Sequence, residues 1–227
     1  LVREYVEQRD INVFFILDAS ANMLFGSVKK LKIEYAIELV TAMANAILGV
    51  GDNVGIALIN DKFIAKIYPQ KGRQQIYNIT KLMINHDNYG GHFRFKAAAE
   101  FALHYLKGFN ILVIVSDFFN LDKNWEESLK LIAKKFDVVG IMVRDPRDRT
   151  FPEDAGEIVI GDPHSNKTLL IEPALIKGAY EKIIKDQELE IEHKFHKNMA
   201  DFVNIPTDKS FVEPILTLFK ERALKWR

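Results

Sequence analysis

Residues 13–22 of the chain read VFFILDASAN, and this stretch decides the fold that the rest of the sequence predicts. Its first five residues are all apolar, and polar residues follow at once. Such a short run of β-branched and aromatic residues is typical of a strand that is buried on both faces of a sheet. Residues 111–115 (ILVIV) and 138–143 (VVGIMV) form two further runs of this kind, and residues 158–160 form a weaker fourth one.

Helical patterns separate these runs. In the first of them apolar side chains recur every three or four residues, at Ile33, Ile37, Val40, Ala44 and Ile47. Similar patterns cover residues 98–105 and 125–136. Strands that alternate with helices of this length predict right-handed βαβ units, and therefore an α/β fold with a mostly parallel central sheet.

One segment interrupts this alternation. Residues 54–59 and 63–68 both have the pattern of a strand, and only Asn60, Asp61 and Lys62 lie between them. Three residues are too few for the crossover that joins parallel strands. We therefore expect an antiparallel pair, with residues 63–68 as an exposed edge strand.

The last part of the chain has a different pattern. A long helix is predicted there from apolar residues at roughly helical spacing, namely Tyr180, Ile184, Ile191, Phe195 and Phe202. No linker rich in Gly, Pro or Ser divides the chain. We expect a single domain over residues 1–227, with its core at about residues 10–162 and a helical C-terminal flank at about residues 163–227.

Composition and charge exclude several classes of protein. The 31 Lys and Arg residues balance 31 Asp and Glu residues, so there is no basic surface for nucleic acid. The absence of cysteine excludes a disulfide framework, a Cys-bound metal and a thiol nucleophile. The apolar runs are much shorter than the ~20 residues of a membrane span. Because the chain starts at Leu1 rather than Met, we expect a fragment or a processed chain. We expect a cytoplasmic location, with a membrane tether through an absent upstream segment as the alternative.

Polar residues follow the predicted central strands, where parallel sheets bind ligands. Asp18, Ser20 and Asn22 follow the first strand, and Asp117 follows the run at residues 111–115. A third polar loop contains Gly90, Gly91 and His92 and precedes a helix. If the two strands are neighbours, Asp18 and Asp117 lie side by side. Carboxylates and hydroxyls at such an edge form an oxygen-rich site that suits Mg²⁺ or Mn²⁺.

Several motifs together resemble one known family. DASAN after a buried strand, the Gly-Gly loop and VIVSDF are similar to the von Willebrand factor A (vWA) superfamily. Within it, the chain most resembles the domain-of-unknown-function 58 family, on the segments VREYVEQRD, LDASANM, GDNVGIALI, VRDPRD, FPEDAG and IPTDKSFVEPILTLF. The resemblance implies a Rossmann-like vWA fold, with helices on both faces of a sheet of strand order 3-2-1-4-5-6. In this order the first and fourth strands lie on either side of the point where the order reverses.

Members of the superfamily carry a metal-ion-dependent adhesion site. By position, Asp18, Ser20 and Asn22 match its first motif, His92 stands at the place of its threonine, and Asp117 matches its later aspartate. The resemblance implies Mg²⁺ or Mn²⁺ at these five residues. Asn22 can still offer a carbonyl oxygen, but imidazole suits Zn²⁺ or Mn²⁺ better than Mg²⁺. A protonated His92 between the two aspartates is the alternative to a metal ion.

The resemblance also implies a function. The expected protein is not an enzyme but an adaptor or scaffold domain that binds other proteins and works with a MoxR-type AAA+ ATPase, or its client, in protein assembly or maturation. One alternative is a metal-assisted hydrolase that uses Asp18, His92 and Asp117. Another is a structural module that self-associates. We interpret the charged segment at residues 145–149 as a salt-bridged surface turn.

Overall fold

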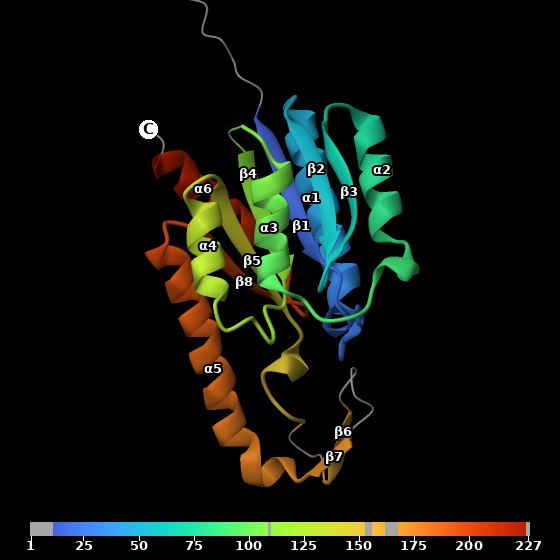
Figure 1. Ribbon diagram of the computed structural model, residues 1–227. Helices are drawn as coiled ribbons and strands as arrows, with labels where there is room; N and C mark the ends of the chain where they lie inside the picture. Colours follow the sequence, from blue (N-terminus) through green and yellow to red (C-terminus); the bar gives the residue numbers. More distant parts are fainter. Residues whose placement is uncertain (1–10, 109, 153–155, 162–167, 226–227) are drawn as a thin grey trace, which may run out of the picture.

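The computed structural model describes residues 11–108, 110–152, 156–161 and 168–225. Its centre is a six-stranded sheet with the strand order β3-β2-β1-β4-β5-β8 (Figure 1). The strands are β1 Asn12–Asp18, β2 Asn53–Ile59, β3 Phe63–Gln70, β4 Asn110–Ser116, β5 Asp137–Arg144 and β8 Asp201–Pro206. Only β3 is antiparallel to its neighbour. The mostly parallel sheet with one antiparallel edge strand that the sequence predicted is confirmed.

Helices cover both faces of this sheet. They are α1 Lys32–Gly49, α2 Arg73–Met83, α3 Phe95–Tyr105, α4 Trp125–Ala133, α5 Pro173–Lys197 and α6 Val212–Lys225. Side chains of β1 alternate between the faces, because successive residues of a strand point in opposite directions. Val13, Phe15 and Leu17 join an apolar cluster with α1, α2 and α6, whereas Phe14 and Ile16 join a second cluster with α3, α4 and α5.

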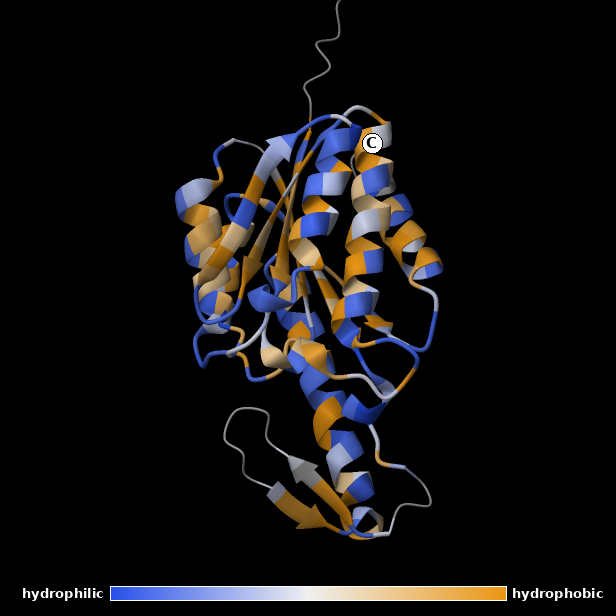
Figure 2. Ribbon diagram, turned by 90° about the vertical axis from the view of Figure 1, so that its right-hand side faces the viewer, coloured by the Kyte–Doolittle hydropathy of each residue, from blue (hydrophilic) through white to orange (hydrophobic). Residues whose placement is uncertain are grey.

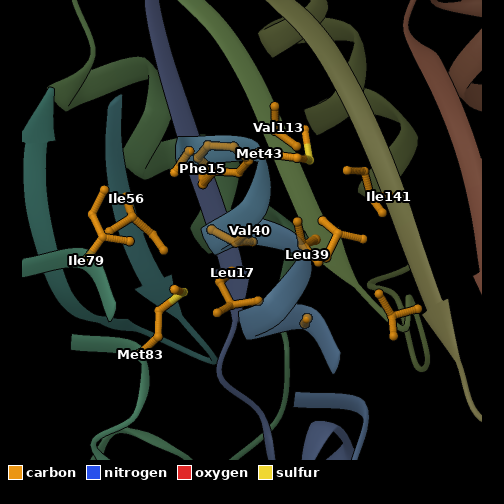
Figure 3. Packing of buried hydrophobic residues seen from close by; sticks show 14 of the residues in the cluster. Phe15, Leu17, Leu39, Val40, Met43, Ile56, Ile79, Met83, Val113 and Ile141 are labelled. Atoms are coloured by element: carbon orange, nitrogen blue, oxygen red, sulfur yellow. The ribbon is translucent and has the colours of Figure 1, made fainter. Parts of the chain in front are cut away.

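The first cluster fills the space between the sheet and α1. Figure 3 shows Phe15 and Leu17 on the strand side of this cluster and Leu39 and Val40 on the helix side. All four side chains are fully buried. The burial of β1 on both faces explains why its sequence is apolar at every position rather than at alternate ones.

The C-terminal part departs from the sequence prediction. The long helix ends at Lys197, and Phe202 lies in β8, which pairs with β5 and completes the main sheet. The prediction of a purely helical C-terminal flank is therefore wrong, because this part of the chain also supplies the sixth strand of the main sheet. The chain turns at Met199, whose φ of 58° is left-handed. Phe195 and Phe202 are seven residues apart, a spacing that would place them on one face of a helix. They do pack together, at 4.9 Å between ring centroids, but a turn separates them.

The segment at residues 158–160 also differs from its prediction as a buried strand. It belongs to β6 Ile158–Gly161, which forms a separate two-stranded antiparallel sheet with β7 Thr168–Ile171. This hairpin projects beyond the carboxyl ends of the main strands, at the N-terminal end of α5 (Figure 1). Val159, Leu169 and Leu170 are exposed there rather than buried, and apolar residues colour much of the hairpin orange in Figure 2.

Candidate functional site

Two central strands bring the predicted acidic residues to the same edge of the sheet. β1 ends at Asp18, and β4 ends at Ser116, next to Asp117 in the chain; these strands are direct neighbours. The Ser116 hydroxyl donates a hydrogen bond to Asp18 Oδ2 at 2.6 Å. Asp18 and Asp117 are 0% and 1% exposed. The carboxylates therefore come together below the surface and not on it.

The Gly-Gly loop lies against the loop that follows β1. The Ala21 N–H donates to the Gly91 carbonyl at 3.0 Å, and the Gly90 N–H donates to the Ala19 carbonyl at 2.9 Å. Gly91 has a φ of 67°, in the left-handed region that glycine tolerates best. This backbone pairing fixes the position of the polar residues around Asp18.

The five predicted site residues occupy three depths. Asp18, Ser20 and Asp117 are buried, Asn22 is half-buried at the rim, and the side chain of His92 is exposed. The Ser20 N–H donates to Asp18 Oδ1 at 2.8 Å. Among the described residues, the Ser20 hydroxyl has no hydrogen-bond partner. The structure thus brings three of the five residues together and leaves His92 at the surface.

A lysine supplies the positive charge beside Asp117. Lys32 is the first residue of α1 and is 1% exposed. Its Nζ lies 2.6 Å from Asp117 Oδ2 and 3.0 Å from Asp148 Oδ2. The centroids of the Phe25 and Phe119 rings lie 5.7 and 5.4 Å from Nζ. The ammonium group therefore binds two carboxylates in a site that is largely closed to water.

Arg144 is a second buried cation in the same place. It is the last residue of β5 and is fully buried. Its guanidinium carbon lies 3.6 Å from the centroid of the Phe119 ring, a stacking contact that suits a weakly hydrated cation. Burial lowers the pKa of Arg144, and the nearby carboxylates of Asp117, Glu188 and Asp148 oppose this effect. Arg144 thus adds a second positive charge near these acidic residues, and its Nε lies 3.9 Å from Glu188 Oε1.

Burial changes the pKa values of two acidic residues at this site, Asp18 and Asp148. Loss of water contact, together with the neighbouring Asp117 carboxylate, raises the pKa of Asp18 from 3.8 to about 7. Burial also raises the pKa of Asp148, although the adjacent Lys32 acts in the opposite direction. Asp18 is therefore largely protonated below neutral pH, and Lys32 compensates the charge of Asp117.

The segment at residues 145–149 is not the surface turn that the sequence indicated. Asp145 is fully buried and Asp148 is 8% exposed. Asp145 begins the short 3₁₀ helix η3, Pro146–Asp148, and accepts hydrogen bonds from the N–H and the hydroxyl of Ser27 at 2.7 and 2.5 Å. The segment therefore joins the loop after β5 to the loop before α1.

Sequence reasoning missed three contributors to this site, namely Lys32, Arg144 and Asp148. Lys32 begins an amphipathic helix, where a lysine is usually exposed, so its position alone gives no signal. Arg144 and Asp148 lie in the motif VRDPRD, which the sequence analysis used only for the family resemblance and the predicted turn. The motif VRDPRD was therefore the one signal in the sequence that could have pointed to Arg144 and Asp148.

The side chains around Asp117 do not fit a divalent metal ion in this arrangement. Lys32 Nζ is already within hydrogen-bond distance of the Asp117 and Asp148 carboxylates, where a metal ion would need oxygen ligands and no competing cation. Within the part of the chain that the structure describes, no group of three or more His, Asp or Glu side chains is placed to hold a metal. Binding of Mg²⁺ or Mn²⁺ at the five residues remains a prediction.

A depression of about 830 Å³ opens above this buried cluster. Its lining includes Asn22, Leu24, Phe25, Lys32 and Phe119. Leu24 and Phe25 are 40% and 45% exposed, so apolar side chains meet water at its rim. This depression therefore lies directly over the buried charged residues, and Lys32 and Asp148 form part of its lining.

Similar proteins agree with this architecture. An uncharacterized protein of Mycobacterium tuberculosis is 23% identical over 225 residues, which cover 97% of this chain and 70% of the relative. The solved structure of the conserved hypothetical protein BatB from Bacteroides thetaiotaomicron has a TM-score of 0.61 at 15% identity, covering 96% of this chain and 100% of BatB. An aerotolerance-related membrane protein from Bacteroides fragilis has a TM-score of 0.56 at 14% identity, covering 86% of this chain and 91% of that one. At these identities the two structures show a common fold alone.

The family follows from the sequence match. Residues 1–190 match the family described as "Protein of unknown function DUF58". The strand order agrees with the vWA-like arrangement that the resemblance implied. Across the described residues, no helix combines the length and the apolar character that crossing a membrane requires. The chain has a vWA-like fold and belongs to the DUF58 family.

Proposed function

We propose that this chain is a non-catalytic protein-interaction domain whose contact face is the carboxyl edge of the sheet. The observation that carries the proposal is the depression of about 830 Å³ with Leu24 and Phe25 exposed at its rim. Exposed apolar groups that gather around a hollow are typical of protein contact sites. The hairpin of β6 and β7 projects from the same edge, with Val159 and Leu169 exposed, and extends this face.

A binding role suits the buried acidic residues better than a catalytic one. A general base must come within hydrogen-bond distance of the proton that it removes, directly or through one water molecule. Asp18 is fully buried and already hydrogen-bonded to Ser116 and to the backbone of Ser20. The carboxylate of Asp117 is paired with Lys32. Both arrangements support a structural use of these carboxylates, so we assign no catalytic residue.

The family resemblance suggests the partner. Adaptors of this kind accompany MoxR-type AAA+ ATPases, and we propose such an ATPase or its client as the protein that binds the carboxyl edge. The proposal includes a cytoplasmic location for this domain, because an ATPase partner requires ATP. Cooperation in protein assembly or maturation would then follow from docking, without chemistry in this chain.

Binding of the purified chain to a MoxR-type ATPase from the same organism tests this proposal. We expect Phe25→Ser to weaken binding by about tenfold or more, as the loss of an aromatic anchor does at protein interfaces. The matched control is Val50→Ser, because Val50 is 79% exposed and follows α1 at the opposite end of the sheet. Equal affinity of both variants and the wild type would contradict the proposed face, and no binding at all would contradict the proposed partner.

The hydrolase alternative has its own test. Phosphate and acyl ester substrates are incubated with the chain in the presence of Mg²⁺ or Mn²⁺, and with Asp117→Asn in parallel. We expect no turnover by either protein. Turnover by the wild type that disappears in Asp117→Asn would replace the binding role with a catalytic one.

A further inference from the structure

Two buried cations, Lys32 and Arg144, lie next to buried carboxylates at the carboxyl edge of the sheet. Lys32 Nζ contacts Asp117 and Asp148 at 2.6 and 3.0 Å. Arg144 Nε lies 3.9 Å from Glu188 Oε1, and its charge also acts on Asp117 and Asp148. Lys32, Arg144, Asp117 and Asp148 are all at most 8% exposed. A vWA-type adhesion site places a divalent cation among its acidic residues, whereas here two side chains supply two positive charges.

We propose that Lys32, together with Arg144, is a built-in cation that replaces the divalent metal of a vWA-type site and makes the carboxyl edge independent of metal ions. Lys32 is the principal member, because its ammonium group contacts the carboxylates directly. Arg144 stacks on the ring of Phe119, and its guanidinium carbon lies 3.6 Å from the centroid of that ring. The inference concerns how the face is held together and does not depend on which partner binds there.

A free metal ion competes poorly with a cation of this kind. Lys32 is covalently attached to α1, so its charge cannot dissociate from the site. To displace it, an ion such as Mg²⁺ would have to lose bound water, which it does reluctantly, while the ammonium group left two carboxylates. The aromatic rings of Phe25 and Phe119 also lie beside Nζ. Each of these features favours the lysine over an ion from solution.

The position of Lys32 also connects elements that are distant in the sequence. Asp117 follows β4, Asp148 ends the segment after β5, and Lys32 begins α1. One ammonium group therefore ties three elements together at the place where the contact face is built. The face is consequently formed as soon as the chain folds, and its formation does not follow the concentration of divalent ions.

Thermal unfolding of the wild-type chain gives the first test. Melting temperatures are measured in EDTA and in millimolar MgCl₂ or MnCl₂, and heats of binding are measured by calorimetry under the same conditions. We expect no shift of the melting temperature beyond experimental error and no heat of binding. A rise with either metal that is abolished in Asp117→Asn would overturn the proposal.

A charge-balance experiment gives the second test. We expect Lys32→Met to lower the melting temperature, because two buried carboxylates then lose their counter-charge. The double variant Lys32→Met/Asp117→Asn should recover part of that loss, since it removes one unpaired charge. Lys30→Met is the matched control, because Lys30 pairs with Glu38 at the surface and should change the melting temperature little.

The outcomes separate clearly. A Lys32→Met variant as stable as Lys30→Met, or a double variant no more stable than Lys32→Met, would overturn the inferred role of Lys32. A heat of binding of either metal to the wild-type chain would overturn the proposal even where a variant does not fold. Neither experiment includes a partner protein, so failure of this inference and failure of the proposed binding role are distinguishable.

Discussion

Replacement of Asp18 by asparagine should change the pH dependence of stability. Burial and the neighbouring Asp117 carboxylate raise the pKa of Asp18 from 3.8 to about 7 in the folded chain. An acid whose pKa is raised by folding binds its proton more tightly in the folded state. The wild type therefore loses stability as pH rises from about 4 to about 7, and above that range the loss is constant. Asparagine keeps the shape of the protonated side chain and does not titrate.

The size of the effect follows from the two pKa values. At 1.36 kcal/mol per pKa unit, the change from 3.8 to about 7 corresponds to about 4 kcal/mol of unfolding free energy. Part of this loss has already occurred at pH 5. Between pH 5 and pH 8 the remaining difference is roughly 2–3 kcal/mol. Asp18→Asn should therefore gain roughly that amount relative to the wild type over this interval.

Urea denaturation at pH 5 and pH 8 measures this difference. Any packing cost of the asparagine is the same at both pH values, so the change in relative stability isolates the titration of Asp18. Asp87→Asn is the control, because it makes the same substitution at an exposed position. Relative stabilities of Asp18→Asn and wild type that are identical at the two pH values would refute the reasoning.

Two further predictions concern the packing and charges of the C-terminal part. A Cβ at Gly140 would lie 2.5 Å from the ring of Phe195, so Gly140→Ala should cost about 1–3 kcal/mol of stability. A melting temperature equal to that of the wild type would contradict the close packing of α5 on β5. Arg222 pairs with Asp137 and Asp201 at the start of β5 and β8. Because these acids keep some water contact, Arg222→Ala should lower the unfolding free energy measured in urea by about 1–2 kcal/mol, and by less at high salt. A loss of stability that does not change with salt would contradict an electrostatic role.

The sequence predicted those parts of the fold that depend on local patterns. Residues 13–17 and 111–115 are apolar at every position, as is typical of strands buried on both faces of a sheet, and they form the neighbouring strands β1 and β4. Phe202 shows where such reasoning ends. Its spacing from Phe195 fits a helix, but a left-handed turn at Met199 places it in β8. Periodicity reports that a side chain is buried and does not report which backbone carries it.

The same division holds for the candidate site. The sequence by itself determined that Asp18 and Asp117 follow parallel strands, and the rule that such strands end at one edge was enough to bring them together. Only the tertiary structure decided that Lys32 is buried against Asp117 and that Asp148 faces the same group. Burial and ion pairing depend on where distant elements meet in space, and a single lysine at the start of a helix has the same local sequence whether it faces water or two carboxylates.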